Sequence, residues 1–129
     1  MNKNMKNIQI SLAVIAILLL AGMPAVAGDK EVDKTKVYYG DPDNFSTPAV
    51  ITLLTVFENI PEYVDAKKKS EDDPEYYILL KKANEKFQKA VKKVATDEGY
   101  DLVGEVGTVK VKGKEVPDVT DKVVKALSE

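Results

Sequence analysis

The side chains of this sequence that could serve acid–base chemistry or metal binding are carboxylates, because histidine and cysteine are both absent and every basic residue is a lysine. Without histidine the usual proton shuttle near neutral pH is missing, and without cysteine there is no thiolate nucleophile and no disulfide. No glycine-rich phosphate loop and no metal-ligand spacing is present either. We therefore expect no enzymatic activity, no cofactor and no metal. Catalysis would need two carboxylates in a shared cleft that raises the pKa of one of them.

The Asp-Val-Thr-Asp string at 118–121 brings three oxygen-bearing side chains together, in a pattern that also suits a metal site or an acid–base pair. Such residues are typical of a helix N-terminus, where their side chains accept hydrogen bonds from free backbone N–H groups. An apolar helical pattern follows directly. We interpret the string as a helix cap.

The first 27 residues have the composition of a cleavable secretory signal peptide. Lys3 and Lys6 lie in a polar start, and Leu12–Ala21 is an uninterrupted apolar run. The small residues that end at Ala27 suit a signal peptidase and predict a mature chain that begins at Gly28. The alternative is an uncleaved anchor, but a spanning helix needs about 20 apolar residues. We expect export out of the cytoplasm.

The charge of the mature chain argues against nucleic acid as a partner. Loss of the two signal lysines leaves 17 lysines against 21 acidic residues, a net charge of −4. The bidentate guanidinium contacts that favour phosphates and base edges are missing, because the chain has no arginine. With about 100 residues and no disulfide, the mature chain has only a modest core, so we expect oligomerisation.

Two regions follow the signal. Residues 28–47 are polar and rich in turn formers, which predicts a flexible lead-in and loop with a short strand at Val37–Tyr39. Residues 48–129 are expected to form the folded domain. It begins with the apolar, β-prone segment Ala49–Thr55, a buried strand that runs into a helix.

A helical hairpin is predicted over residues 56–98. Its first leg carries an apolar face of Phe57, Ile60 and Val64, and Pro61 either occupies an early helical turn or kinks the helix. Its second leg, 74–98, follows acidic capping residues and ends before Gly99. The apolar seam of this second leg repeats at spacings of three and four, at Tyr76, Leu80, Ala83, Phe87, Ala90 and Val94.

The C-terminal part predicts a β-hairpin and a short helix. The β-prone segments Tyr100–Val103 and Thr108–Lys112 are separated by a Gly-containing turn and predict a hairpin over 100–112. A helix over 120–128 would begin at Asp118 or Thr120 as N-cap, with a buried face of Val123, Val124 and Leu127. The expected fold class is α+β: a small β body of about three strands with a short C-terminal helix and a projecting antiparallel helical-hairpin arm.

The order of these elements, together with three local strings, resembles the Skp/OmpH family of periplasmic chaperones over most of the mature chain. The strings are Thr-Val-Phe-Glu-Asn-Ile-Pro-Glu-Tyr at 55–63, Gly-Tyr-Asp-Leu-Val at 99–103 after the helix, and Pro-Asp-Val-Thr-Asp-Lys-Val-Val-Lys-Ala-Leu at 117–127. The resemblance implies a Skp-like homotrimer that works in the periplasm. Its strands would form a shared body, and its hairpin arms would hold unfolded outer-membrane or envelope proteins without ATP.

Two departures from the family limit the expected function. Only about 40 residues, 56–98, are available for the arm, so any cavity between arms is shallow. The lysine run at 67–69 is followed at once by the acidic run at 71–73, so the tip is near neutral and at most weak contact with a membrane surface is expected. These departures favour an alternative, a non-catalytic envelope adaptor or scaffold with one specific partner.

The residues expected to contact a client are Tyr63, Tyr77 and Ile78, near the predicted tip. Tyrosine rings are amphipathic and can contact varied apolar segments at low entropic cost. Tyr76 lies on the apolar seam, so we expect it to pack in the hairpin. Tyr77 and Ile78 lie off the seam, and for them core packing and client contact are equally favoured.

Overall fold

The computed structural model describes residues 29–129, so the expected signal peptide with its cleavage point at Ala27 and Gly28 lies outside the described residues. The chain divides into two compact units. The described part of the first consists of residues 29–31 and 111–114. The second consists of residues 32–110 and 115–129, and it holds the helices and the larger sheet.

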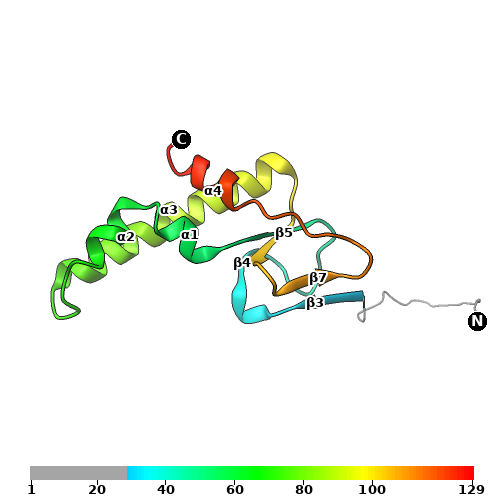
Figure 1. The fold of residues 1–129 in the computed structure, drawn as a ribbon, viewed down its shortest axis with the longest axis horizontal. Coiled ribbons are helices and arrows are strands. Elements are labelled where there is room, and N and C mark those ends of the chain that lie inside the picture. The colour runs from blue at the N-terminus through cyan, green and yellow to red at the C-terminus, as the bar shows by residue number, and fades with distance from the viewer. Residues whose placement is uncertain (1–28) are drawn as a thin grey trace, which may run out of the picture. The chain divides into compact units, whose positions relative to one another are not determined.

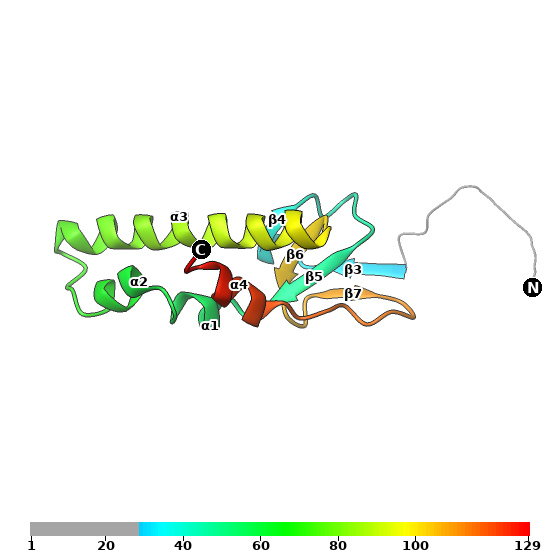
Figure 2. The same cartoon turned by 90° about the horizontal axis from the view of Figure 1, so that it is seen from above.

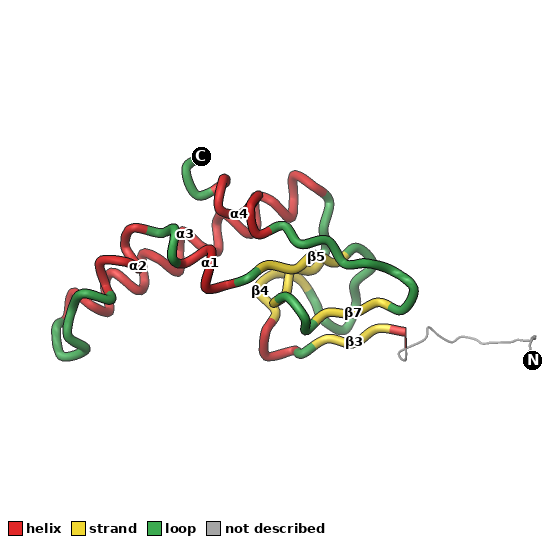
Figure 3. The backbone as a smooth tube through the Cα atoms, viewed as in Figure 1, coloured by secondary structure: helices red, strands yellow, loops and turns green. Residues whose placement is uncertain are grey.

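The fold is a small α+β fold with two small sheets, which contain five strands in the described residues, one long helix and a short C-terminal helix (Figure 3). One sheet pairs β3 (Lys30–Val32) with β7 (Val109–Val111). The other has the order β4-β6-β5, with β4 at Val37–Gly40, β6 at Leu102–Glu105 and β5 at Pro48–Ile51. The fold class expected from the sequence is confirmed at this level.

The central strand β6 is antiparallel to β4 and parallel to β5. Parallel neighbours need a long crossover connection. Here the crossover contains α1 (Leu53–Phe57), α2 (Pro61–Ala66) and α3 (Pro74–Glu98). The outer edge of β5 is covered, because Val50 exchanges backbone hydrogen bonds with Pro117 and Val119 at 2.9 and 2.8 Å. β4 remains an edge strand of this sheet.

Helix α3 spans the residues that the sequence predicts. The Asp73 carboxylate accepts a hydrogen bond from the Glu75 N–H at 2.9 Å, and Pro74 occupies the first helical position, where no N–H is needed. Gly99 ends the helix in the left-handed conformation at φ 82°, and its N–H donates to the Ala95 carbonyl.

The first leg of the helical pair is two short helices instead of one. Pro61 is at the first turn of α2, which confirms one of the two expected roles, and the chain turns between α1 and α2. Figures 1 and 2 both show α2 alongside α3. The expected apolar face of this leg is only partly buried: Ile60 is buried and Phe57 is half-buried, whereas Val64 is exposed because α2 turns it away from α3.

The hydrophobic core lies where the C-terminal two thirds of α3 meet the sheet, α1 and α4 (Thr120–Ala126). The buried residues of α3 are Ala83, Phe87, Ala90, Val91, Val94 and Ala95. Tyr76 and Leu80, at the other end of the expected seam, are only half-buried. The apolar seam is therefore confirmed where α3 crosses the core and weaker where α2 is its neighbour.

Two expectations about the strands are wrong. The segments β6 and β7 do not form a β-hairpin, because β6 pairs on both sides with β4 and β5 while β7 pairs with β3. The flexible lead-in expected over residues 28–47 is wrong for residues 29–36, which contain β3 and a 3-10 helix at Lys34–Lys36, whereas the short strand expected at Val37–Tyr39 is confirmed as β4. Strands β3 and β4 add backbone partners to β7 and β6, which come much later in the chain.

Candidate functional site

Tyr63, one of three residues expected to contact a client, is committed to packing. Its ring lies 5.3 Å from that of Phe57, and the Lys67 ammonium is 5.2 Å from its ring centroid. The side chain is half-buried against the hydrophobic core. The Tyr63 ring therefore takes part in the packing of α2 on α1.

Tyr77 and Ile78, the other two, are exposed on the first two turns of α3. Their exposed fractions are 59% and 53%, and both are among the large hydrophobic residues that the fold leaves uncovered. Tyr76 turns the other way and is half-buried, with its ring edge-on to that of Tyr77 at 5.0 Å between centroids. This contact orients the Tyr77 ring on the surface.

Other large hydrophobic side chains exposed in the described residues are dispersed. Leu54 lies on α1, Val64 on α2 and Val106 in the turn after β6. Tyr77 and Ile78 are adjacent in the chain, so they form the candidate contact surface that is apolar over two consecutive residues.

Two lysine–carboxylate ion pairs lie in the segments that precede and begin α3. Lys69 lies 3.4 Å from the Glu75 carboxylate, and Lys68 lies 3.9 Å from that of Asp65. The helical tip therefore presents mixed charge instead of the strong positive field that would attract anionic surfaces.

The position of α2 against α3 is fixed by a charged contact as well as by packing. The Glu62 carboxylate accepts a hydrogen bond from the Lys86 ammonium at 2.7 Å. This bond lowers the pKa of Glu62 from its usual value, with a further contribution from the charge of Lys82. Glu62 therefore stays ionised and holds the two helices together at neutral pH.

A polar contact that the sequence did not indicate fixes the base of the helices to the sheet. The Tyr38 hydroxyl donates to Glu105 Oε1 at 2.7 Å, and the same oxygen accepts the Leu53 N–H at 3.0 Å. Burial, followed by the hydrogen bond to Glu105, raises the pKa of Tyr38. The phenol stays protonated, so it acts as a structural donor. Glu105 meanwhile caps the first turn of α1.

The aromatic rings beneath this contact form one stack. Phe87 of α3 lies 4.8 Å from Phe57 in a stacked arrangement and 5.5 Å from Tyr38 in an edge-on arrangement, measured between ring centroids. Phe87 is 1% exposed. The stack therefore joins α1, α3 and β4, and it sets the direction in which α3 leaves the core.

The string at 118–121 caps α4, but neither expected residue is the N-cap, because Val119 holds that position and Thr120 is the first residue of the helix. Asp118 Oδ1 accepts the Thr120 N–H at 2.9 Å and the Thr120 hydroxyl at 2.5 Å, and that hydroxyl accepts the Thr52 N–H at 2.9 Å. The residue before α4 in the chain is Val119, so Asp118 caps the helix from one position further back. Among the described residues no group of three acidic side chains is placed to hold a metal ion.

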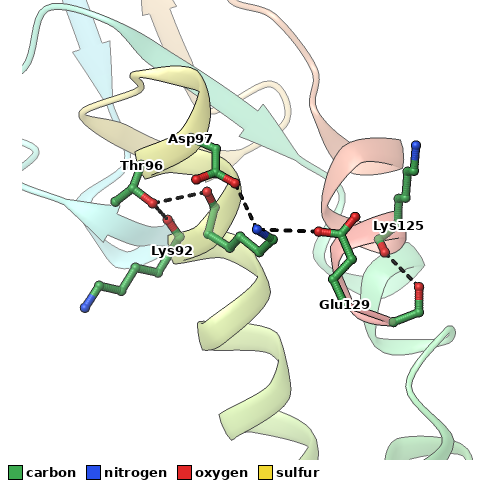
Figure 4. A network of polar contacts seen from close by, with 7 residues as sticks. Lys92, Thr96, Asp97, Lys125 and Glu129 are labelled. Carbon is green, nitrogen blue, oxygen red and sulfur yellow. Dashed lines mark hydrogen bonds and ion pairs between the residues drawn. The ribbon is translucent and has the colours of Figure 1, made fainter.

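A shallow cleft of about 290 Å³ lies between the C-terminal end of α3 and α4. Figure 4 shows the ion pairs at its wall: Lys93 lies 3.0 Å from Asp97 and 3.5 Å from Glu129. At the other side Lys122 lies 2.7 Å from Glu98. The hydrogen bonds to Asp97 and Glu98 raise the pKa of the two lysines. The amines of Lys93 and Lys122 are thus engaged with neighbouring carboxylates.

Comparison with protein-family models, with curated proteins and with solved structures found no match to this chain. Within residues 29–129, none of the helices combines the length and the apolar character needed to cross a membrane.

Proposed function

We propose that this protein is an ATP-independent periplasmic holdase, similar to the Skp/OmpH chaperones, that binds unfolded outer-membrane or envelope proteins. The observation that carries this proposal is the exposure of two consecutive residues, Tyr77 and Ile78, near the N-terminal end of α3. Adjacent exposed apolar side chains can be covered by an apolar segment of a partner, and this supports a contact site at this position.

The mechanism is binding without chemistry. A client segment covers Tyr77 and Ile78, and this contact keeps the client's apolar strands from pairing with one another. Each contact is weak, because two half-exposed side chains bury little area. A bound client therefore dissociates without ATP once it can fold elsewhere.

We propose a homotrimer as the working form, with the helical arms of three copies around one client. Strand β4 supports this assembly, because an edge strand offers unpaired backbone groups to another chain. Sedimentation of the mature chain tests it directly. A stable monomer across the micromolar range would contradict the trimer. Binding would then rest on the contact surface of Tyr77 and Ile78 in a single copy of the chain.

Aggregation of an unfolded outer-membrane β-barrel, diluted from urea, tests the holdase function. We expect the mature protein to keep the barrel in solution at stoichiometric excess. The double variant Tyr77→Ser with Ile78→Ser should need about thirtyfold more protein for the same effect, because each of the two covered side chains contributes on the order of 1 kcal/mol.

The matched control is Leu54→Ser with Val106→Ser, two side chains of similar exposure outside α3. It should suppress aggregation like the parent protein. Failure of the parent protein itself to suppress aggregation would exclude the holdase function.

A non-catalytic adaptor with one specific envelope partner is the second candidate. The mixed charge of the tip and the shortness of the paired helices favour it, since α2 has only six residues. Capture from an envelope extract distinguishes the two functions: one saturable partner supports the adaptor, and many unrelated unfolded proteins support the holdase.

A further inference from the structure

The outward face of α3 carries a stripe of three lysines, Lys81, Lys89 and Lys92. All three are exposed, and their spacings of eight and three residues place them on one side of a helix with 3.6 residues per turn. This side is opposite to the buried face that contains Phe87 and Ala90. The stripe faces solvent along about 16 Å of the helix at 1.5 Å per residue.

The three amines of the stripe have no acidic partner within 4.0 Å among the described residues. Two other lysines of α3 differ: Lys86 is bonded to Glu62, and Lys93 to Asp97. Figure 4 shows the Lys92 amine pointing away from the Asp97 network. Glu85 is the one carboxylate on this side of the helix, so the stripe keeps a net positive charge within an acidic chain.

The stripe is continuous with the apolar contact surface. Tyr77 and Ile78 precede Lys81 by four and three residues, the spacings at which helical side chains are neighbours. The outward side of α3 therefore presents a large apolar pair at one end and unpaired ammonium groups along the rest.

We infer that this surface selects client segments that combine apolar residues with carboxylates, so that acidic unfolded segments bind in preference to neutral or basic ones. The inference rests on the proposed holdase function and names its substrate class. An extended segment rises about 3.3 Å per residue, so about six residues span the distance from Ile78 to Lys92. A short acidic stretch beside one or two apolar residues matches this length and charge.

An anionic membrane surface fits the same lysines less well. A helix that lies in a membrane interface needs an apolar face along its whole length next to its basic face. The apolar face of α3 is buried in the core, and Tyr77 and Ile78 are the large apolar groups that its outward side leaves exposed. The contact therefore suits a peptide better than a bilayer.

The test uses three fluorescein-labelled 14-residue peptides with identical apolar residues, in which four intervening positions are all Glu, all Ser or all Lys. Fluorescence anisotropy measures their binding to the full mature chain at low salt. We expect the Glu peptide to bind about tenfold more tightly than the Ser peptide, from three exposed ion pairs of ordinary strength. The difference should shrink at high salt, where the Debye length falls to about 3 Å.

The triple variant Lys81→Gln, Lys89→Gln and Lys92→Gln should bind the Glu and Ser peptides equally. A control variant removes three exposed lysines outside α3, Lys36→Gln, Lys110→Gln and Lys112→Gln, and it should keep the preference. Circular dichroism and sedimentation verify that both variants keep the fold and assembly of the parent.

Each other outcome overturns the inference. Equal binding of the Glu and Ser peptides by the parent protein refutes the charge selection while the holdase function stands. Absence of binding to any peptide, together with failure to suppress aggregation, refutes both the charge selection and the holdase function. Phosphatidylglycerol vesicles that bind more tightly than the Glu peptide, and that the triple variant no longer binds, would make the stripe a membrane contact.

Discussion

Replacement of Phe87 by alanine tests the central claim about the core of this protein. Phe87 is the largest fully buried side chain, and its ring contacts those of Phe57 and Tyr38 at 4.8 and 5.5 Å between centroids. Removal of a buried phenylalanine costs about 3–5 kcal/mol through lost transfer energy and the cavity that remains. Each lost aromatic pair adds about 0.5–1.5 kcal/mol. We therefore expect a loss of about 5 kcal/mol.

A loss of this size approaches the whole stability of a small domain, which is about 5–15 kcal/mol. Urea unfolding followed by circular dichroism at 222 nm measures the change in the free energy of unfolding. Protein concentration must be the same for parent and variant, because assembly raises the apparent stability. The midpoint should shift by several molar, or the variant should be unfolded at the start.

The control variant is Tyr77→Ala, which removes a ring of similar size from the same helix at an exposed position. Surface substitutions usually change the free energy of unfolding by less than about 0.5 kcal/mol, so this variant should unfold like the parent. A Phe87→Ala variant that loses less than about 1 kcal/mol would refute the packing argument, since large losses belong to core cavities. The stack of rings would then not be what orients α3.

Two further changes test the backbone and the charged contact between the helices. Gly40→Ala should destabilise the protein strongly, because Gly40 has φ +93° and the added Cβ would lie 2.1 Å from the Asp101 carbonyl oxygen. The control is Gly99→Ala, at φ +82° with nothing within 4 Å of the added Cβ, which should lower the free energy of unfolding by only about 1 kcal/mol. Thermal unfolding measures both changes. The Glu62–Lys86 ion pair lowers the pKa of Glu62, so its contribution is present above the unfolded pKa and is lost as the pH falls through the lower folded value. Stability measured from pH 6 to pH 3 should therefore decline less in Glu62→Gln than in the parent, and an identical decline in both would contradict the role of the pair.

Local sequence signals determined the long helix α3 of this protein. The cap at Asp73, the first-turn proline at 74 and the terminal Gly99 set the bounds of α3 through groups within a few residues of each end. For Pro61 the local signal left two roles open, an early helical turn or a kink, and the structure has it in the first turn of α2. Such signals act through steric limits and hydrogen bonds between near neighbours, so they can be recognised without knowledge of the rest of the fold.

Strand pairing was decided by the tertiary structure. The segments at β6 and β7 are close in the chain and look like a hairpin, yet β6 lies between β4 and β5, and β7 pairs with β3. Backbone hydrogen-bonding groups are alike in every strand, so the choice of partner depends on which faces can be buried together. That choice is not visible in either segment alone.

The candidate site shows the same division. Three residues near the tip had the composition of a contact surface, but the packing of Tyr63 on Phe57 separates it from Tyr77 and Ile78, which stay exposed. The contact between Tyr38 and Glu105 joins residues 67 positions apart, and no local pattern indicates it. Residue types and helical spacing thus determined what this protein offers to a partner. The tertiary structure decided which of those side chains remain free to make contact, because burial depends on neighbours that the chain supplies from a distance.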